Sequence, residues 1–229
     1  MKQPFPVSMR RYEILWGIVF FVVSQFLMGA ILSLLFGLFG VEETDVTLNG
    51  TYYVVNFLFN ALIFRRFLAY SLPVAAEHLL RFFKAIVLGF LLYLGCQMLT
   101  GFLAGIISPE FATPNDDTVH AIAEANYNVM WVGAVLLAPM VEETLMRGLI
   151  FSNIRRKSRL FAYILTAIVF AAMHILPFVT TMDVLSIVLN VMAYGLPSIA
   201  LCAAYEISGT IWASIALHMI INAIAMTVV

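Results

Sequence analysis

Residues 132–151 read VGAVLLAPMVEETLMRGLIF, an apolar run with three charged side chains near its middle. Glu142 and Glu143 are adjacent, and Arg147 follows Glu143 by four residues, which is one turn of a helix. Ionisable side chains are costly within a membrane, so those found there usually have a function. This stretch therefore predicts a transmembrane helix that carries a polar site.

Composition indicates that lipid surrounds most of the chain. Of its 229 residues 63% are hydrophobic and 11% charged, and the mean hydropathy is +1.00, whereas soluble domains hold about 25% charged residues. We predict an all-α fold, a polytopic transmembrane helix bundle of about seven spans of roughly 20 residues, with a buried polar active-site cavity. Residues 1–229 should form a single integral membrane domain. The apolar segments are 12–40, 52–68, 82–107, 127–150, 160–176, 183–205 and 209–228.

The basic residues predict the orientation of these spans. All of them except Arg147 fall on one side of the membrane, and the loops on the other side hold only acidic charges. By the positive-inside rule the N-terminus is cytoplasmic, and an odd number of spans places the C-terminus outside. We expect a protein of the plasma (cytoplasmic) membrane without a nucleic-acid partner. The basic side comprises Lys2, Arg10, Arg11, Arg65, Arg66, Arg81, Lys84, Arg155, Arg156, Lys157 and Arg159.

Three further polar side chains fall inside apolar segments. His174 lies in the fifth segment, and His218 and Asn222 lie in the seventh, four residues apart and thus on one helix face. At the helical rise per residue, Glu142, His174 and Asn222 lie about 20 to 22 Å from the predicted cytoplasmic ends of their segments, and His218 about 15 Å. Residues matched in depth on three helices are what a buried site requires.

A proline adds a structural expectation for the fourth segment. Pro139 precedes Glu142 by three residues and cannot donate a hydrogen bond to the carbonyl of Val135, so it should kink the helix. A free carbonyl at this depth is tolerated beside protein or water. We therefore expect a wet cavity next to the glutamates.

Together these residues resemble the CPBP family of intramembrane proteases, which is named for CAAX proteases and bacteriocin-processing enzymes and is also called Abi. The family pattern is EExxxR, then FxxxH, then HxxxN or HxxxD. The resemblance runs from about residue 127 to residue 229, and the earlier residues show only spans. The matching positions, in order, are Glu142, Glu143, Arg147, Phe170, His174, His218 and Asn222.

The resemblance implies an intramembrane endopeptidase (a hydrolase) that cleaves a membrane-associated or lipidated peptide or protein. The implied fold is a helical bundle whose cavity opens toward the cytosol and the membrane. Family members act on prenylated CAAX proteins, on bacteriocin or pheromone precursors, or in self-immunity to bacteriocins. The implied partners are the lipid bilayer and this substrate.

The three charged residues of the fourth segment should have different roles. Glu143 can neutralise Arg147 within one helix, so we expect these two residues to form a structural pair that supports the site. Glu142 has no such partner in sequence, which suits proton transfer.

In the mechanism that we prefer, no metal takes part. Glu142, helped by His174, activates water, while His218 and Asn222 donate hydrogen bonds to the developing oxyanion, and Phe170 supports the site. A zinc site would instead use Glu142, His174 and His218 as ligands, which leaves no unpaired carboxylate as the base. The zinc alternative stays open if Glu143 leaves Arg147 and becomes that base.

Two other function classes remain open at this point. A small-solute transporter also holds charges at mid-membrane, although here they cluster in the second half of the chain. A non-catalytic scaffold or immunity protein could keep the same residues. Two loop histidines, His78 and His120, should be solvated, and aromatic residues near span ends, such as Tyr53, should anchor the membrane interface.

Overall fold

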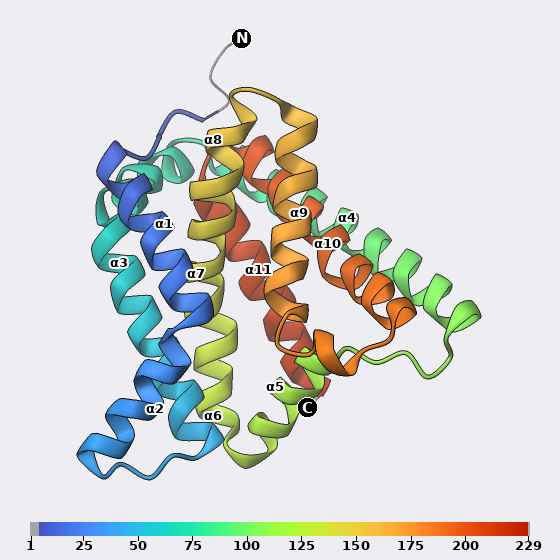
Figure 1. Cartoon of the computed structure of the whole chain (residues 1–229). Coiled ribbons are helices and arrows are strands. Elements are labelled where there is room, and N and C mark those ends of the chain that lie inside the picture. Colours follow the sequence, from blue (N-terminus) through green and yellow to red (C-terminus); the bar gives the residue numbers. More distant parts are fainter. Residues whose placement is uncertain (1–4, 229) are drawn as a thin grey trace.

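The computed structural model of the chain describes residues 5–228 and shows a bundle built of helices only (Figure 1). The predicted all-α membrane bundle is confirmed. Lys2 and Val229 lie outside the described residues. Large apolar side chains cover the outside of the bundle, for example Leu80, Phe39 and Met98, which are all strongly exposed in the isolated chain. Such a surface requires lipid around it, so the chain is an integral membrane protein.

The first apolar segment forms two helices, α1 (Arg11–Phe26) and α2 (Met28–Phe39), which meet at an angle of 65°. The Tyr52 hydroxyl donates to the Ser24 carbonyl at 3.1 Å, the acceptor that a continuous helix would offer to the amide of Met28. The Ser24 hydroxyl also bonds back to the Phe21 carbonyl, a contact that bends helices. A neighbouring helix and a local serine therefore explain the bend.

Two long helices follow, α3 (Asp45–Glu77) and α4 (Leu79–Ile107). The Thr44 side chain accepts the amide of Thr47 and caps the start of α3. The next helix, α5 (Pro114–Ala125), is short and polar, and falls where the sequence predicted a loop. Its first-position proline and the early acidic residues Asp116 and Asp117 favour a helix start.

The charged fourth segment is one helical rod from Tyr127 to Arg155. It consists of α6 (Tyr127–Met130), a π-helical stretch η1 (Trp131–Leu137), α7 (Ala138–Glu143), a second π-helical stretch η2 (Thr144–Phe151) and α8 (Ser152–Arg155). The amide of Ala138 donates to the carbonyl of Gly133, five residues earlier. The carbonyl left without a donor by Pro139 is, in this register, that of Ala134. The predicted carbonyl, Val135, was therefore wrong by one residue, because the prediction assumed an α-helical register.

The remaining helices pack around this rod. They are α9 (Arg159–Ile175), η3 (Val179–Thr181), α10 (Val184–Ser208), α11 (Ile211–Ala225) and η4 (Met226–Val228). Helix α10 ends at Gly209, whose φ of 79° is the left-handed conformation that suits glycine. Gly89 of α4 lets that helix approach closely, because a side chain there would collide with Leu217 and Ala204.

Each of the seven predicted apolar segments is helical, but their number as spans stays a prediction. Four helices, namely α3, α4, the 127–155 rod and α10, are long and apolar enough to cross a membrane, and the bent pair α1 and α2 would be a fifth span. Helices α9 and α11 are apolar but shorter, with 17 and 15 residues. The basic segments, at the start of α1, the α3–α4 junction and α8, gather at one end of the bundle, and α5 lies at the other (Figure 1).

Candidate active site

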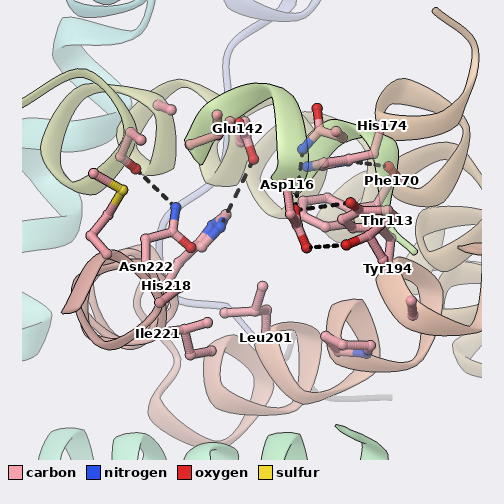
Figure 2. A pocket seen from close by; sticks show the side chains of 18 of the residues that line it. Thr113, Asp116, Glu142, Phe170, His174, Tyr194, Leu201, His218, Ile221 and Asn222 are labelled. Carbon is pink, nitrogen blue, oxygen red and sulfur yellow. Dashed lines mark hydrogen bonds and ion pairs between the residues drawn. The ribbon is translucent and has the colours of Figure 1, made fainter. Parts of the chain in front are cut away.

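One cavity of about 420 Å³ lies among α7, α9, α10 and α11, with α5 as part of its wall. The four residues predicted to be catalytic all line it, namely Glu142, His174, His218 and Asn222 (Figure 2). The residues that the sequence placed at similar depths on three helices therefore do meet at one cavity. Their individual catalytic roles stay predictions.

A sealed polar cluster adjoins this cavity. Arg147 and Glu143 form an ion pair of 2.9 Å with both side chains at 0% exposure, as their spacing predicted. The second terminal nitrogen of Arg147, Nη2, donates to the Ser198 hydroxyl at 2.9 Å and to the Ser198 carbonyl at 3.1 Å. The Ser214 hydroxyl donates to Glu143. Both charges are thus paired and hydrogen-bonded, which buried charges require.

His218 connects the sealed cluster to the cavity. Its Nδ1 lies 2.8 Å from Glu143 Oε1, and its Nε2 lies 4.0 Å from Glu142 Oε2. A carboxylate accepts hydrogen bonds, so Nδ1 carries the proton and a neutral His218 has its lone pair on Nε2. Glu143 is therefore more than the partner of Arg147, because it also fixes the tautomer and the orientation of His218.

His174 is held from the opposite side of the cavity. Its Nδ1 lies 2.8 Å from the Phe170 carbonyl, an acceptor, so this nitrogen also carries the proton. The imidazole stacks on the Tyr194 ring with 4.5 Å between centroids. Phe170 is buried between the two imidazoles, and Arg147 lies over its face, 4.7 Å from the centroid. Its role as a supporting residue of the motif thus has a physical basis in packing and a cation–π contact.

Asn222 fills the gap that Pro139 leaves in the helical rod. Its side-chain amide donates to the Ala134 carbonyl at 2.8 Å, which is the carbonyl that lacks a backbone donor in the π-helical register. One amide hydrogen of Asn222 is therefore committed to structure, and the second is free for another acceptor. The expected cavity next to the glutamates is present, since Glu142 lines it.

The predicted zinc ligands do not form a preassembled set. Among the residues that the structure describes, no three histidine, cysteine, aspartate or glutamate side chains are grouped as a metal site requires. The donor types would suit zinc, but their placement does not.

Several residues of the cavity were not predicted. Asp116 and His120, on α5, line it, as does Tyr53 of α3. His120, which was predicted to lie in a solvated loop, is half-buried on the helix α5. Tyr53, which was predicted to anchor the membrane interface, packs against the rod at Gly133. His78 is exposed, as expected. The helix α5 covers this part of the cavity. The only sequence signal for it was the proline at its first position and the acidic residues of its first turn.

The wall of the cavity includes α5, which lies at the end of the bundle opposite the basic segments (Figure 1). The predicted opening of the cavity toward the cytosol and the membrane stays a prediction, as does the orientation of the basic end.

Comparison with known proteins gives one family match. Residues 124–224, which include every motif residue above, match the family described as type II CAAX prenyl endopeptidase Rce1-like. The resemblance to the CPBP family is confirmed. The matched segment begins at the end of α5 and ends within α11, so α1 to α4 lie outside it.

A curated protein is also similar to the chain, at low identity. The chain is 26% identical to the UPF0177 protein YvdC of Lactococcus lactis subsp. lactis (strain IL1403). The alignment extends over 143 residues, which are 62% of the chain. The chain spans about half the length of this relative, 51%. No solved structure matches the chain.

Proposed function

We propose that this protein is an intramembrane endopeptidase of the CAAX type, which hydrolyses a peptide bond in a membrane-associated or lipidated peptide or protein. One observation carries the proposal: Glu142, His174, His218 and Asn222 come from three helices and line one cavity. The family match supports a peptidase of this class. Processing of a bacteriocin or pheromone precursor, or self-immunity, is the proposed biological setting, and lipid and substrate are the proposed partners.

Water activation requires a base that water can reach. The Glu142 side chain is 23% exposed to the cavity, while the adjacent Glu143 is sealed. Glu142 would take a proton from the attacking water, and the resulting hydroxide would add to the scissile carbonyl. The lone pair on Nε2 of neutral His174 can accept the second water hydrogen. The proton on Glu142 then passes to the leaving amine as the C–N bond breaks.

The developing oxyanion requires donors on the other side of the substrate. The proposal assigns His218 the doubly protonated form, in which Nδ1 donates to Glu143. In that form Nε2 donates a hydrogen bond, and the second amide hydrogen of Asn222 supplies another.

The proposed reaction uses no metal, because side chains of the protein then supply the base, the second acceptor for water and the two donors to the oxyanion. The alternative, with Zn²⁺ held by Glu142, His174 and His218, would supply a polarised water. It requires Glu143 to act as the base, and Glu143 is bound by Arg147, Ser214 and His218. This network supports the metal-free version.

The test compares wild type with Glu142→Gln, which keeps the shape of the side chain but cannot take up the proton. Either protein is produced in cells, and new peptide N-termini in the membrane fraction are identified by mass spectrometry. Termini that appear only with wild type support a peptidase and reveal its substrate. Equal termini with both proteins would leave a scaffold or immunity role, which should tolerate glutamine at this position.

We also propose that the basic end is cytoplasmic and that the protein resides in the plasma membrane. The charge asymmetry of the loops supports this orientation. A reporter inserted at Lys157 should be cytoplasmic, and one fused after Val229 extracytoplasmic. Both reporters on the same side would show that the number of spans between Lys157 and Val229 is even and not three.

A further inference from the structure

We propose that Tyr194 is a positioning residue, which sets the plane of the His174 imidazole and ties it to α5, the cover of the cavity. The inference rests on the proposed function only where it assigns His174 a part in catalysis. The Tyr194 ring lies parallel to the imidazole within 19°, with 4.5 Å between centroids. Its hydroxyl donates to Asp116 Oδ1 at 2.9 Å (Figure 2).

The imidazole needs such a contact because little else fixes it. His174 has one hydrogen bond, from Nδ1 to the Phe170 carbonyl of its own helix. That bond defines the tautomer, but the ring can still tilt about it. Tyr194 on one side and the Phe170 ring on another, 4.6 Å between centroids, restrict this tilt. Tyr194 is the one of these contacts that comes from a different helix.

Helix α5 is held in two different ways along its length. Toward its C-terminal end, Ile122 and Ala123 are buried in an apolar cluster. At its N-terminal end the contacts with α10 are polar, since the buried Asn190 donates to the Ala112 carbonyl at 3.2 Å and Tyr194 follows one turn later on the same face. The N-terminal half of α5 is therefore the part that can move while the C-terminal half stays anchored.

These contacts couple the cover of the cavity to the orientation of His174. Displacement of the N-terminal half of α5, as entry of a peptide past Asp116 would require, breaks the Tyr194 hydrogen bond. The Tyr194 ring is then free to turn and no longer restricts the imidazole. Closure of α5 restores both contacts, so that the working orientation of His174 returns when the cavity is covered.

Two substitutions of Tyr194 in the full-length protein separate its contacts. Tyr194→Phe keeps the stacking ring and removes the hydroxyl, whereas Tyr194→Leu removes both. Tyr93→Phe is the matched control, because Tyr93 also lines the cavity but its hydroxyl contacts Gln97 of its own helix. Hydrogen–deuterium exchange of the backbone amides of residues 112–117 measures how often the N-terminal end of α5 opens. The ¹⁵N resonances of the His174 imidazole, identified by their loss in His174→Gln, report the ring.

Tyr194→Phe should raise exchange at residues 112–117 about fivefold, the factor that loss of one hydrogen bond produces, and broaden the His174 resonances, because the ring without its hydrogen bond can turn. Tyr194→Leu should raise exchange by a similar factor and shift those resonances further, because the stacking ring is absent. The Tyr93 control should change neither.

Unchanged exchange in Tyr194→Phe would refute the tie to α5, and unchanged His174 resonances in Tyr194→Leu would refute the positioning role. Where cleavage is measured, Tyr194→Leu should lower kcat at least about tenfold more than Tyr194→Phe. Neither exchange nor the resonances depend on turnover. Absence of peptidase activity would therefore disprove the proposed function, while the exchange and resonance measurements would still test the role of Tyr194.

Discussion

Glu142 and Glu143 are neighbours in the chain but belong to two regions with opposite environments. Glu143 lies in the sealed cluster, at 0% exposure, and contacts Arg147, Ser214 and His218. Glu142 faces the cavity, is 23% exposed, and has its Oε2 4.0 Å from Nε2 of His218. Consecutive residues of a helix point about 100° apart, so one turn of backbone can place one carboxylate in a fixed network and the other beside water.

This difference divides structure from chemistry within a single dipeptide. A carboxylate with three partners holds its neighbours in place, and a base that is bound in this way is poorly placed to collect a proton. The cavity carboxylate has the access that a base needs. His218 contacts both regions, so its hydrogen bond to Glu143 in the sealed cluster fixes how its Nε2 points into the cavity.

The largest expected effect comes from Glu142→Gln. Removal of a general base should lower kcat about 10² to 10⁴-fold, while the free energy of unfolding in detergent changes by less than about 0.5 kcal/mol because the side chain is partly exposed. Product formation followed by mass spectrometry and a thermal unfolding curve measure the two quantities. If Glu142→Gln unfolds easily instead, the comparison of the two glutamates is broken, because Glu142 would then be structural.

The next largest effect should come from Arg147→Ala, which leaves the charge of Glu143 buried without its partner. We expect a loss of about 3 to 5 kcal/mol in the free energy of unfolding. The matched control is the double variant Glu143→Gln with Arg147→Met, which removes both charges and should recover much of that loss. Equal destabilisation in the single and double variants would show that the ion pair is not what the sealed cluster depends on.

Much of the site could be predicted from the sequence because its residues are rare in their surroundings. Charged and amide groups in an apolar chain are few, so their spacing and depth identified Glu142, Arg147, His174 and Asn222. The ion pair followed from the i to i+4 rule within one helix. These predictions depend on local geometry, which the sequence determines strongly.

The parts that could not be predicted depend on contacts between distant segments. Asp116 reaches the site because α5 folds over the cavity, and Ser198 reaches Arg147 from a helix 51 residues away. The π-helical register that moved the free carbonyl from Val135 to Ala134 has no clear sequence signature besides Pro139. Serine and aspartate are common near helix ends, so nothing in the sequence distinguished Ser198 and Asp116 from ordinary capping or interfacial residues.

A smaller effect should come from Asn222, the amide that belongs to both regions. Asn222→Ala leaves the Ala134 carbonyl without a donor and should cost about 1 to 3 kcal/mol of stability. Pro139→Ala supplies a backbone amide in the helical rod, so the double variant should recover about 1 kcal/mol of that loss. Additive losses would show that Pro139 is not the reason that Asn222 is needed there. Activity should stay low in the double variant, because the donor to the oxyanion is still absent.

The smallest expected effect is that of metal removal, which tests whether Glu142 is a base or a ligand. Zinc would draw Glu142, His174 and His218 together and leave the proton transfer to Glu143, so the division between the two glutamates would reverse. A catalytic zinc site needs three protein ligands and an open position, and these three side chains are not grouped in that way among the described residues. Purified protein treated exhaustively with a strong zinc chelator should therefore keep its full activity, with less than stoichiometric zinc by elemental analysis. Activity that is lost on chelation and restored by stoichiometric Zn²⁺ would make Glu142 a ligand and overturn the metal-free mechanism.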